Sequence, residues 1–287
     1  MEYDSSRAAL LTPEAQPALP FDPDWQPEAL CAEFSRLAYK RVESSDAHKE
    51  ETNAALRAAG YGPATPFVGR SIVHGRDFWA YAFGTVNADG TAVVAFRGTQ
   101  PQNISNVLDD IQFWPRRWTG SGRVHRGFLR AYEGLREQID AWLAGQPPAR
   151  LIITGHSLGA AMATLMAARY PGAELVTFGS PRVGGRGFAA QFAGRTVRRY
   201  VDCYDFVTNL PPPIWFRHVA EMHYVDRHGA VHSPPLGLMG RVKDRLLADL
   251  SYAVKCTFKR GSLWFRTGAD HAPINYVAAV LGKRVGP

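Results

Sequence analysis

The feature that most constrains this chain of 287 residues is a G-x-S-x-G motif at 155–159, which joins a strand pattern to a helix pattern. A short apolar run at 150–154 leads straight into the motif, and an alanine-rich run at 159–170 follows it. This order is typical of a strained strand-to-helix turn, in which glycines leave room for the turn to close around Ser157. The helix behind such a turn directs backbone N–H groups and its positive dipole end toward an oxyanion. The strand pattern before the motif and the helix pattern after it, more than the motif itself, therefore indicate a nucleophilic serine.

Beyond Gly69 the chain alternates strand patterns with helix patterns. The turn residues at 87–90 predict a hairpin. Strand patterns lie at 77–84, 91–96, 150–154, 174–179 and 197–201, and helix patterns lie at 27–39, 127–143, 159–170 and after 273. Because this alternation favours right-handed crossovers, we predict an α/β fold, with a mostly parallel sheet and helices on both faces.

The net charge of +7 raises the question of a nucleic-acid partner. Such a partner requires a basic cluster interleaved with exposed aromatic residues or a known reader motif. The nearest approach is the segment 115–118, which is too short to serve as one. We therefore expect no nucleic acid among the partners.

The cysteines and the N-terminus bear on location. Three cysteines are too few for a disulfide framework, which favours a reduced compartment. The first residues are acidic and lead into no apolar core of the kind that a secretory signal has. No apolar run reaches the roughly 18 residues that a membrane span needs. The expected location is cytoplasmic by default, and the oligomeric state stays open.

A serine hydroxyl reacts only when a histidine accepts its proton and an acid orients that histidine. In folds of the predicted kind the order along the chain is serine, acid, histidine. Asp202 and Asp205 both follow the strand pattern at 197–201 and are both candidates for the acid. The downstream histidines are His218, His223, His228, His232 and His271. The order does not choose among them, but the local pattern favours His271, which stands just before an apolar-periodic helix.

At this point the sequence resembles a known family, the class 3, fungal-type triacylglycerol lipases of the α/β-hydrolase fold. The resemblance covers about 91–276 and depends on several motifs in a fixed order. They lie at 96–99, at 106 with 110, and at 124–128, 155–159, 178–184, 205–207, 210–212 and 270–271. Each motif is weak alone, but the ordered series is specific.

The resemblance implies the roles of the reacting side chains. Ser157 would be the nucleophile, His271 the base and Asp205 the acid that orients the base. Asp205 is preferred to Asp202 because the family's acid precedes a valine and a Leu-Pro-Pro turn. Asp202 is then kept only as an accessory residue.

The resemblance also implies an oxyanion hole that needs no metal and no cofactor. The backbone N–H of Leu158 would supply one donor. Thr99 would supply another, and its hydroxyl can add a third. His125 matches a family position and is kept as an accessory residue, although a structural role is favoured over a direct catalytic one.

One segment precedes the predicted single catalytic domain at 27–287, and another lies within it. The first 26 residues are rich in proline, and we expect an extended arm with no core of its own. By resemblance, the segment 100–113 would form a lid over Ser157.

The segment 234–260 is a basic amphipathic helix pattern. Its apolar positions are Leu238, Met239, Val242, Leu246, Leu250, Ala253 and Val254, and six cations accompany only two aspartates. One interpretation is a helix on an anionic membrane surface, and the other is a helix that packs on the core with a solvated face.

The sequence therefore predicts a serine hydrolase that cleaves carboxylic esters of lipids through an acyl-enzyme. A phospholipase A or lysophospholipase with the same triad, acting at a membrane or lipid-droplet surface, is one alternative. An amidase or peptidase is another, because a triad does not define the leaving group. A third is a lipase-like binding module without catalysis.

Overall fold

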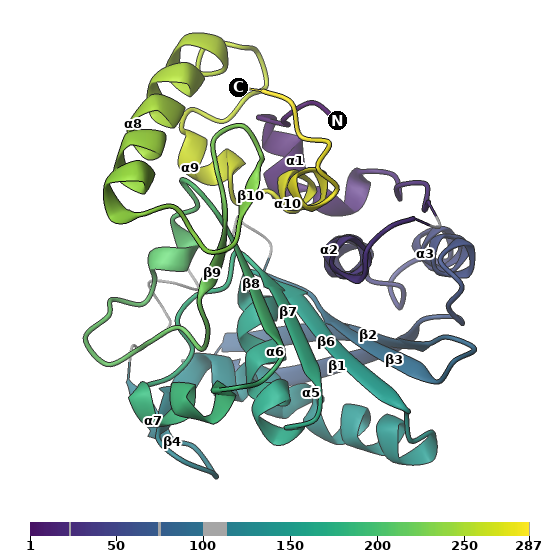
Figure 1. Ribbon diagram of the computed structural model, residues 1–287. Coiled ribbons are helices and arrows are strands. Elements are labelled where there is room, and N and C mark those ends of the chain that lie inside the picture. The colour runs from purple at the N-terminus through teal and green to yellow at the C-terminus, as the bar shows by residue number, and fades with distance from the viewer. Residues whose placement is uncertain (23, 74–75, 100–113, 287) are drawn as a thin grey trace.

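The computed structural model describes residues 1–22, 24–73, 76–99 and 114–286. Eight strands form one sheet in the order β1-β2-β3-β6-β7-β8-β9-β10 (Figure 1). Strands β3, β6, β7, β8 and β9 run parallel to one another, and β1, β2 and β10 are antiparallel to their neighbours. The predicted α/β fold, a mostly parallel sheet between helices, is confirmed.

The strands of the sheet are β1 (Thr65–Val73), β2 (Arg76–Val86), β3 (Thr91–Phe96), β6 (Arg150–His156), β7 (Glu174–Phe178), β8 (Val197–Asp202), β9 (Met222–Val225) and β10 (Val231–His232). A separate ribbon pairs β4 (Pro115–Arg117) with β5 (Arg123–His125). The longer helices are α2 (Pro27–Leu37), α3 (Asp46–Ala58), α5 (Arg126–Gly145), α6 (Leu158–Arg169), α8 (Leu238–Lys255) and α10 (Pro273–Val280). Short helices are α1 (Arg7–Leu11), α7 (Arg186–Ala189) and α9 (Arg266–Ala269), with single 3-10 turns between them.

Both faces of the sheet are covered, and each cover contributes to the core. Helices α5 and α6 pack on one face, while α2, α3 and α10 lie on the other (Figure 1). All six residues of β3 are buried for this reason. A strand covered on both sides needs a continuous apolar run instead of an alternating pattern, which is what the sequence 91–96 has.

The predicted elements lie within about two residues of the observed ones, and the hairpin at 87–90 joins β2 to β3 as expected. Two of the longer elements, α3 and β1, were not predicted. The helix α3 is strongly polar, and β1 is interrupted by glycine, so neither has a clear periodic pattern.

The first 26 residues are not the extended arm that their prolines predicted. Ser6 caps α1 by accepting a hydrogen bond from the Ala9 N–H, and Ala9 and Leu10 are buried against the C-terminal segment. Tyr3 also pairs with the last residues of the chain, since its N–H donates to the Val285 carbonyl at 2.9 Å. Both chain ends lie together in Figure 1. The prediction was wrong because this segment packs on residues more than 250 positions away, which no local pattern reports.

The predicted basic segment contains α8, which stands at the end of the molecule beside α9 (Figure 1). Its buried residues are Asp244, Ala248 and Tyr252, whereas its leucines face outward. Within the described ranges, no helix combines the length and the apolarity needed to cross a bilayer. The predicted lid at 100–113 lies outside the described residues.

Candidate active site

Ser157 stands at the sharp turn between β6 and α6. Its φ of 58° and ψ of −127° lie outside the regions that residues with a side chain normally adopt. A Cβ added at Gly155 would lie 2.5 Å from the carbonyl of Gly159, and one added at Gly159 would lie 2.2 Å from the Phe96 oxygen. Both positions therefore require glycine, because the strand packs closely on the helix at Gly155 and the helix packs closely on β3 at Gly159. The strain is of the kind found at functional turns.

The structure brings Ser157, His271 and Asp205 together at the carboxyl ends of the parallel strands. The Ser157 Oγ lies 2.9 Å from the His271 Nε2, and the His271 Nδ1 lies 2.8 Å from the Asp205 Oδ2. The three side chains are at most 3% exposed. The hydroxyl can thus pass its proton to the imidazole, while the carboxylate fixes the ring and stabilises the cation that forms.

Asp205 is held by more than the histidine. Its Oδ1 accepts the Val207 N–H at 2.9 Å, and its Oδ2 also accepts the Tyr276 hydroxyl at 2.6 Å. The same hydroxyl accepts the Asp202 N–H at 3.0 Å, so Tyr276 ties the end of β8 to the carboxylate. Sequence reasoning missed Tyr276. Its position five residues after His271, on the helix that follows, was the available signal.

The loop after β3 lies against the nucleophile. A Cβ added at Gly98 would lie 3.1 Å from the Cβ of Ser157 and 2.8 Å from the His156 carbonyl oxygen. The Oγ1 of Thr99 is buried and makes no hydrogen bond with the described part of the chain. Leu158 begins α6, so its N–H belongs to the first turn, where backbone donors lack partners within the helix. Leu158 thus follows the nucleophile directly, and Gly98, the neighbour of Thr99, lies against it.

His156 lies beside the reacting histidine. Its Nδ1 lies 2.8 Å from the Tyr39 hydroxyl, and its ring centroid is 4.6 Å from that of His271. Burial lowers the pKa of His156 well below its ordinary value, and the neighbouring His271 lowers it further. The His156 ring therefore stays neutral beside His271.

The two predicted accessory residues, Asp202 and His125, have their partners away from the Ser157 hydroxyl. Asp202 forms a buried ion pair with Arg284. His125 is fully buried at the start of α5, where its ring stacks on Phe128 at 4.1 Å. Burial lowers the pKa of His125 to about 3, so the ring stays neutral. Neither residue contacts the serine among the interactions described, and both contribute to packing.

Three of the other downstream histidines have partners away from Ser157. His218 approaches the Thr208 carbonyl at 3.0 Å, and His232 pairs with Asp226 at 2.8 Å. His223 stacks on Tyr200. Of the described histidines downstream of Ser157, His271 is the one that lies between the serine and an acid. Position therefore separates the alternatives that the order of residues had left open.

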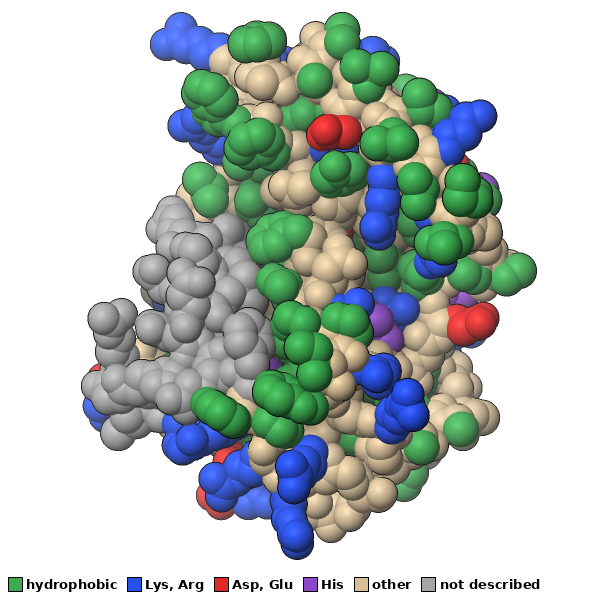
Figure 2. Space-filling model, turned by 90° about the vertical axis from the view of Figure 1, so that its left-hand side faces the viewer, with side chains coloured by type: hydrophobic (Ala, Val, Ile, Leu, Met, Phe, Trp, Pro, Cys, Tyr) green, Lys and Arg blue, Asp and Glu red, His purple; other side chains and the backbone are tan. Residues whose placement is uncertain are grey.

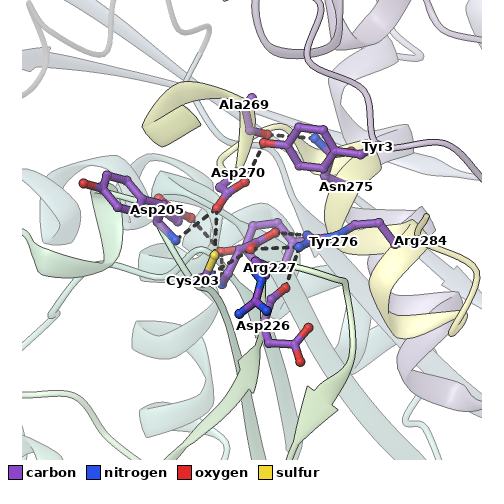
Figure 3. Close-up of polar contacts among 12 residues, drawn as sticks. Tyr3, Cys203, Asp205, Asp226, Arg227, Ala269, Asp270, Asn275, Tyr276 and Arg284 are labelled. Atoms are coloured by element: carbon purple, nitrogen blue, oxygen red, sulfur yellow. Dashed lines mark hydrogen bonds and ion pairs between the residues drawn. The ribbon is translucent and has the colours of Figure 1, made fainter. Parts of the chain in front are cut away.

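A buried ionic network supports the loop that carries His271 (Figure 3). Asp270 pairs with Arg266 at 3.1 Å and accepts the Tyr3 hydroxyl at 2.5 Å. Burial raises the pKa of Asp270, but the facing arginines Arg266 and Arg284 outweigh it and hold that pKa below its ordinary value. Asn275 donates to the Ala269 carbonyl at 2.8 Å and to the backbone of the N-terminal segment. The first residues of the chain are thus part of the support of the catalytic loop.

Asp202, Cys203 and Asp270 lie close enough together to raise the question of a metal site. Each carboxylate, however, pairs with an arginine. Burial raises the pKa of the Cys203 thiol well above its ordinary value, and Asp270 raises it further. The thiol therefore donates to Asp270, at 3.3 Å, and is not the thiolate that a metal ligand must be. The donor set does not suit a metal.

Comparison with known proteins shows that part of this chain is similar to lipases. Residues 93–215 match the family described as Lipase (class 3). The secreted mono- and diacylglycerol lipase 1 of Fusarium solani is 35% identical over 156 residues, covering 50% of this chain and 46% of that protein. The chloroplastic phospholipase A(1) DAD1 of Arabidopsis thaliana is 34% identical over 148 residues, covering 42% of this chain and 33% of that protein. The chain therefore spans less than half the length of these curated relatives.

A solved structure agrees in fold. The mono- and diacylglycerol lipase of Aspergillus oryzae aligns with a TM-score of 0.58 and 23% identity, covering 69% of this chain and 78% of that one. At this identity the likeness supports the α/β-hydrolase fold alone.

The cytoplasmic location predicted above is contradicted by the relatives, because the Fusarium protein is a secreted lipase. The inference from the cysteines was weak for a structural reason. Cys31, Cys203 and Cys256 are all buried, and each is a free thiol within the core. Buried cysteines behave as small apolar residues, so their number does not report the compartment.

Proposed function

We propose that this chain is a serine hydrolase of lipid carboxylic esters and a member of the class 3 lipase family, whose model matches residues 93–215. The observation that carries the proposal is the relay in which Ser157, at a strained φ of 58°, approaches His271 at 2.9 Å. The Asp205 Oδ2 lies 2.8 Å from the His271 Nδ1 and completes this set of three side chains. The relatives are lipases, but they match over less than half of their length, so the substrate is part of the proposal.

In the first half of the proposed reaction, the Ser157 Oγ attacks the ester carbonyl carbon while His271 takes the hydroxyl proton. The carbonyl oxygen becomes an oxyanion, which the Leu158 N–H and the Thr99 donors stabilise. When the tetrahedral intermediate collapses, His271 gives the proton to the leaving alcohol and an acyl-serine remains.

The second half repeats the sequence with water. His271 removes a proton from the water as it attacks the acyl carbon, and the tetrahedral intermediate forms in the same oxyanion hole. Collapse releases the fatty acid and returns the proton to Ser157. Asp205 orients the imidazole in both halves of the reaction.

Labelling with a fluorophosphonate probe tests the nucleophile. The probe should label the wild-type chain and should not label Ser157→Ala. Ser35→Ala is the matched control, since Ser35 is equally buried but bonds to the Thr154 hydroxyl at 2.9 Å. Equal labelling of Ser157→Ala would refute the assignment. No labelling of any of the three proteins would favour a lipase-like binding module without catalysis.

A second candidate is phospholipase A activity at a membrane surface. The named activity of the Arabidopsis relative and the exposed cations around α8 favour it. Fatty-acid release from a triacylglycerol emulsion, from phosphatidylcholine vesicles and from a soluble p-nitrophenyl ester separates the candidates. Release from vesicles exceeding release from the emulsion would favour the phospholipase. Hydrolysis of p-nitroanilides but not of esters would refute both.

A further inference from the structure

Helix α8 is attached to the protein by its polar side. Asp244 accepts the Tyr224 hydroxyl at 2.9 Å and pairs with Arg227 at 2.9 Å. Two turns further along, the Tyr252 hydroxyl donates to the Leu263 carbonyl at 2.9 Å. The usual arrangement, in which a helix buries its apolar stripe and shows its polar side to water, is reversed here.

The apolar stripe of α8 is therefore exposed. Leu246 is 67% exposed and Leu250 is 63% exposed, and they lie four residues apart on the outer side of the helix. The other outward apolar residues of the helix are Leu238, Met239, Val242 and Val254. Large apolar residues in such a stripe rarely face water in a monomeric protein unless something covers them.

Aromatic residues extend this surface toward the catalytic loop. Phe258 is 91% exposed and Trp264 is 63% exposed, and Phe265 stands beside Trp264 with most of its ring exposed. Phe265 is the N-cap of α9, and the loop after α9 carries His271. The docking face is defined here as the outer side of α8 together with these three aromatic residues. Figure 2 shows hydrophobic side chains grouped over the upper part of this side of the molecule, with lysine and arginine around them.

The charges around the docking face are complementary to an anionic partner. Segment 238–265 holds six cations and two aspartates, and one of the aspartates is Asp244, already paired and buried. Four of the cations are exposed: Lys243, Lys255, Lys259 and Arg260. A helix with leucines outward, aromatic side chains at its end and lysines at its border matches what lies in the interface of an anionic bilayer.

We propose that the docking face binds the surface of an anionic phospholipid membrane and presents the catalytic loop to it. A lipid surface fits better than a protein partner, because the apolar stripe is flanked by cations and ends in tryptophan and phenylalanine. The purpose of the contact rests on the proposed hydrolysis of lipid esters, but the binding itself does not. The two can therefore fail separately.

Flotation of the full chain with vesicles tests the binding. The wild-type chain should float with phosphatidylcholine vesicles that contain phosphatidylserine, and less with phosphatidylcholine alone or at high salt. Leu246→Ser with Leu250→Ser should weaken the apparent affinity for the anionic vesicles by about tenfold or more. Trp79→Ser is the matched control, because Trp79 is an exposed apolar residue on β2, outside the docking face. It should float as the wild type does.

The charge is tested separately by Lys259→Glu with Arg260→Glu. This variant should lose the preference for phosphatidylserine while keeping the weaker binding to phosphatidylcholine. Wild-type flotation that is independent of phosphatidylserine would overturn the anionic part of the proposal.

Three outcomes would overturn the proposal as a whole. The first is that the wild type does not float, and the second is that the leucine variant floats as well as the wild type. Size-exclusion chromatography could instead show a dimer that the leucine variant converts to a monomer without a change in flotation, which would assign the face to a second copy of the chain. Hydrolysis of a soluble p-nitrophenyl ester is measured in parallel and should be equal in the wild type and the leucine variant. If the wild type floats and the leucine variant floats less, but neither hydrolyses the ester, the proposed function fails and the docking face stands.

Discussion

Gly179 follows β7 at a φ of +59°, with the catalytic pair directly beside it. A Cβ added there would lie 2.7 Å from the Asp205 Oδ2 and 3.1 Å from the His271 Nδ1. Ordinary contacts of a Cβ begin at 3.4 Å, so in Gly179→Ala the carboxylate would have to retreat by the difference of about 0.7 Å. That movement stretches the 2.8 Å bond that orients His271.

The expected loss of activity follows from this displacement. A misplacement of about 1 Å in a reacting group can cost roughly a hundredfold in rate, so we expect Gly179→Ala to lower kcat/KM by about 30-fold or more. A positive φ separately costs an alanine about 1–2 kcal/mol in stability. The fold should therefore survive with a reduced free energy of unfolding.

Gly194→Ala separates the two effects. Gly194 also has a positive φ, +73°, but an added Cβ would meet nothing within 4 Å. This control should lose a similar free energy of unfolding in urea while hydrolysing a soluble p-nitrophenyl ester like the wild type. The reasoning is refuted if Gly179→Ala keeps kcat/KM within about threefold of Gly194→Ala, because the contact with the triad would then have no effect.

Two further changes test the buried charges. Arg284→Met leaves Asp202 unpaired in a site where both side chains are 0% exposed, and should lower the free energy of unfolding in urea by about 3–5 kcal/mol. The control Arg57→Met breaks an exposed pair and should lower it by less than about 1 kcal/mol. Equal losses would contradict the assignment of the buried pair. Burial lowers the pKa of His125 from 6.5 to about 3. The unfolded chain therefore gains a proton below pH 6.5 that the folded chain does not gain. Between pH 7.5 and pH 5.5 this difference lowers the free energy of unfolding of the wild type by about 1.4 kcal/mol. The stability difference between wild type and His125→Phe should shift by that amount in favour of the variant at the lower pH, and a constant difference would argue against a neutral buried ring.

The parts of the fold that could be predicted are those determined by short-range patterns. The elbow at Ser157 needs a strand, close-set glycines and a helix within about 20 residues, and all of them are visible in the sequence. The buried strand β3 and the hairpin before it are local in the same sense. For these elements, propensity, periodicity and turn chemistry agree, which is the condition under which local sequence is informative.

The parts that could not be predicted depend on pairs far apart in the chain. Tyr276 and Asp205 are 71 residues apart, and Arg284 and Asp202 are 82 residues apart. Tyr3 reaches Asp270 across 267 residues. No spacing rule connects such positions, so the sequence offered Asp202 and Asp205 as equals until the resemblance separated them. Tertiary contacts then distinguish the two aspartates, because Asp202 pairs with Arg284 and Asp205 contacts His271.

The orientation of α8 shows how such long-range pairs decide what a surface does. The amphipathic periodicity of this helix is visible in the sequence. Which side of the helix faces the protein, however, depends on Tyr224 and Arg227, the partners of Asp244. Burying one carboxylate with these partners requires the opposite side of the helix, the leucine stripe, to face outward. Arg266 reaches the Ala248 carbonyl of the same helix at 3.2 Å and also pairs with Asp270, the neighbour of His271. The polar contacts that expose the apolar stripe therefore belong to the network that holds the catalytic loop, so a contact at the docking face and the position of His271 share one rigid support.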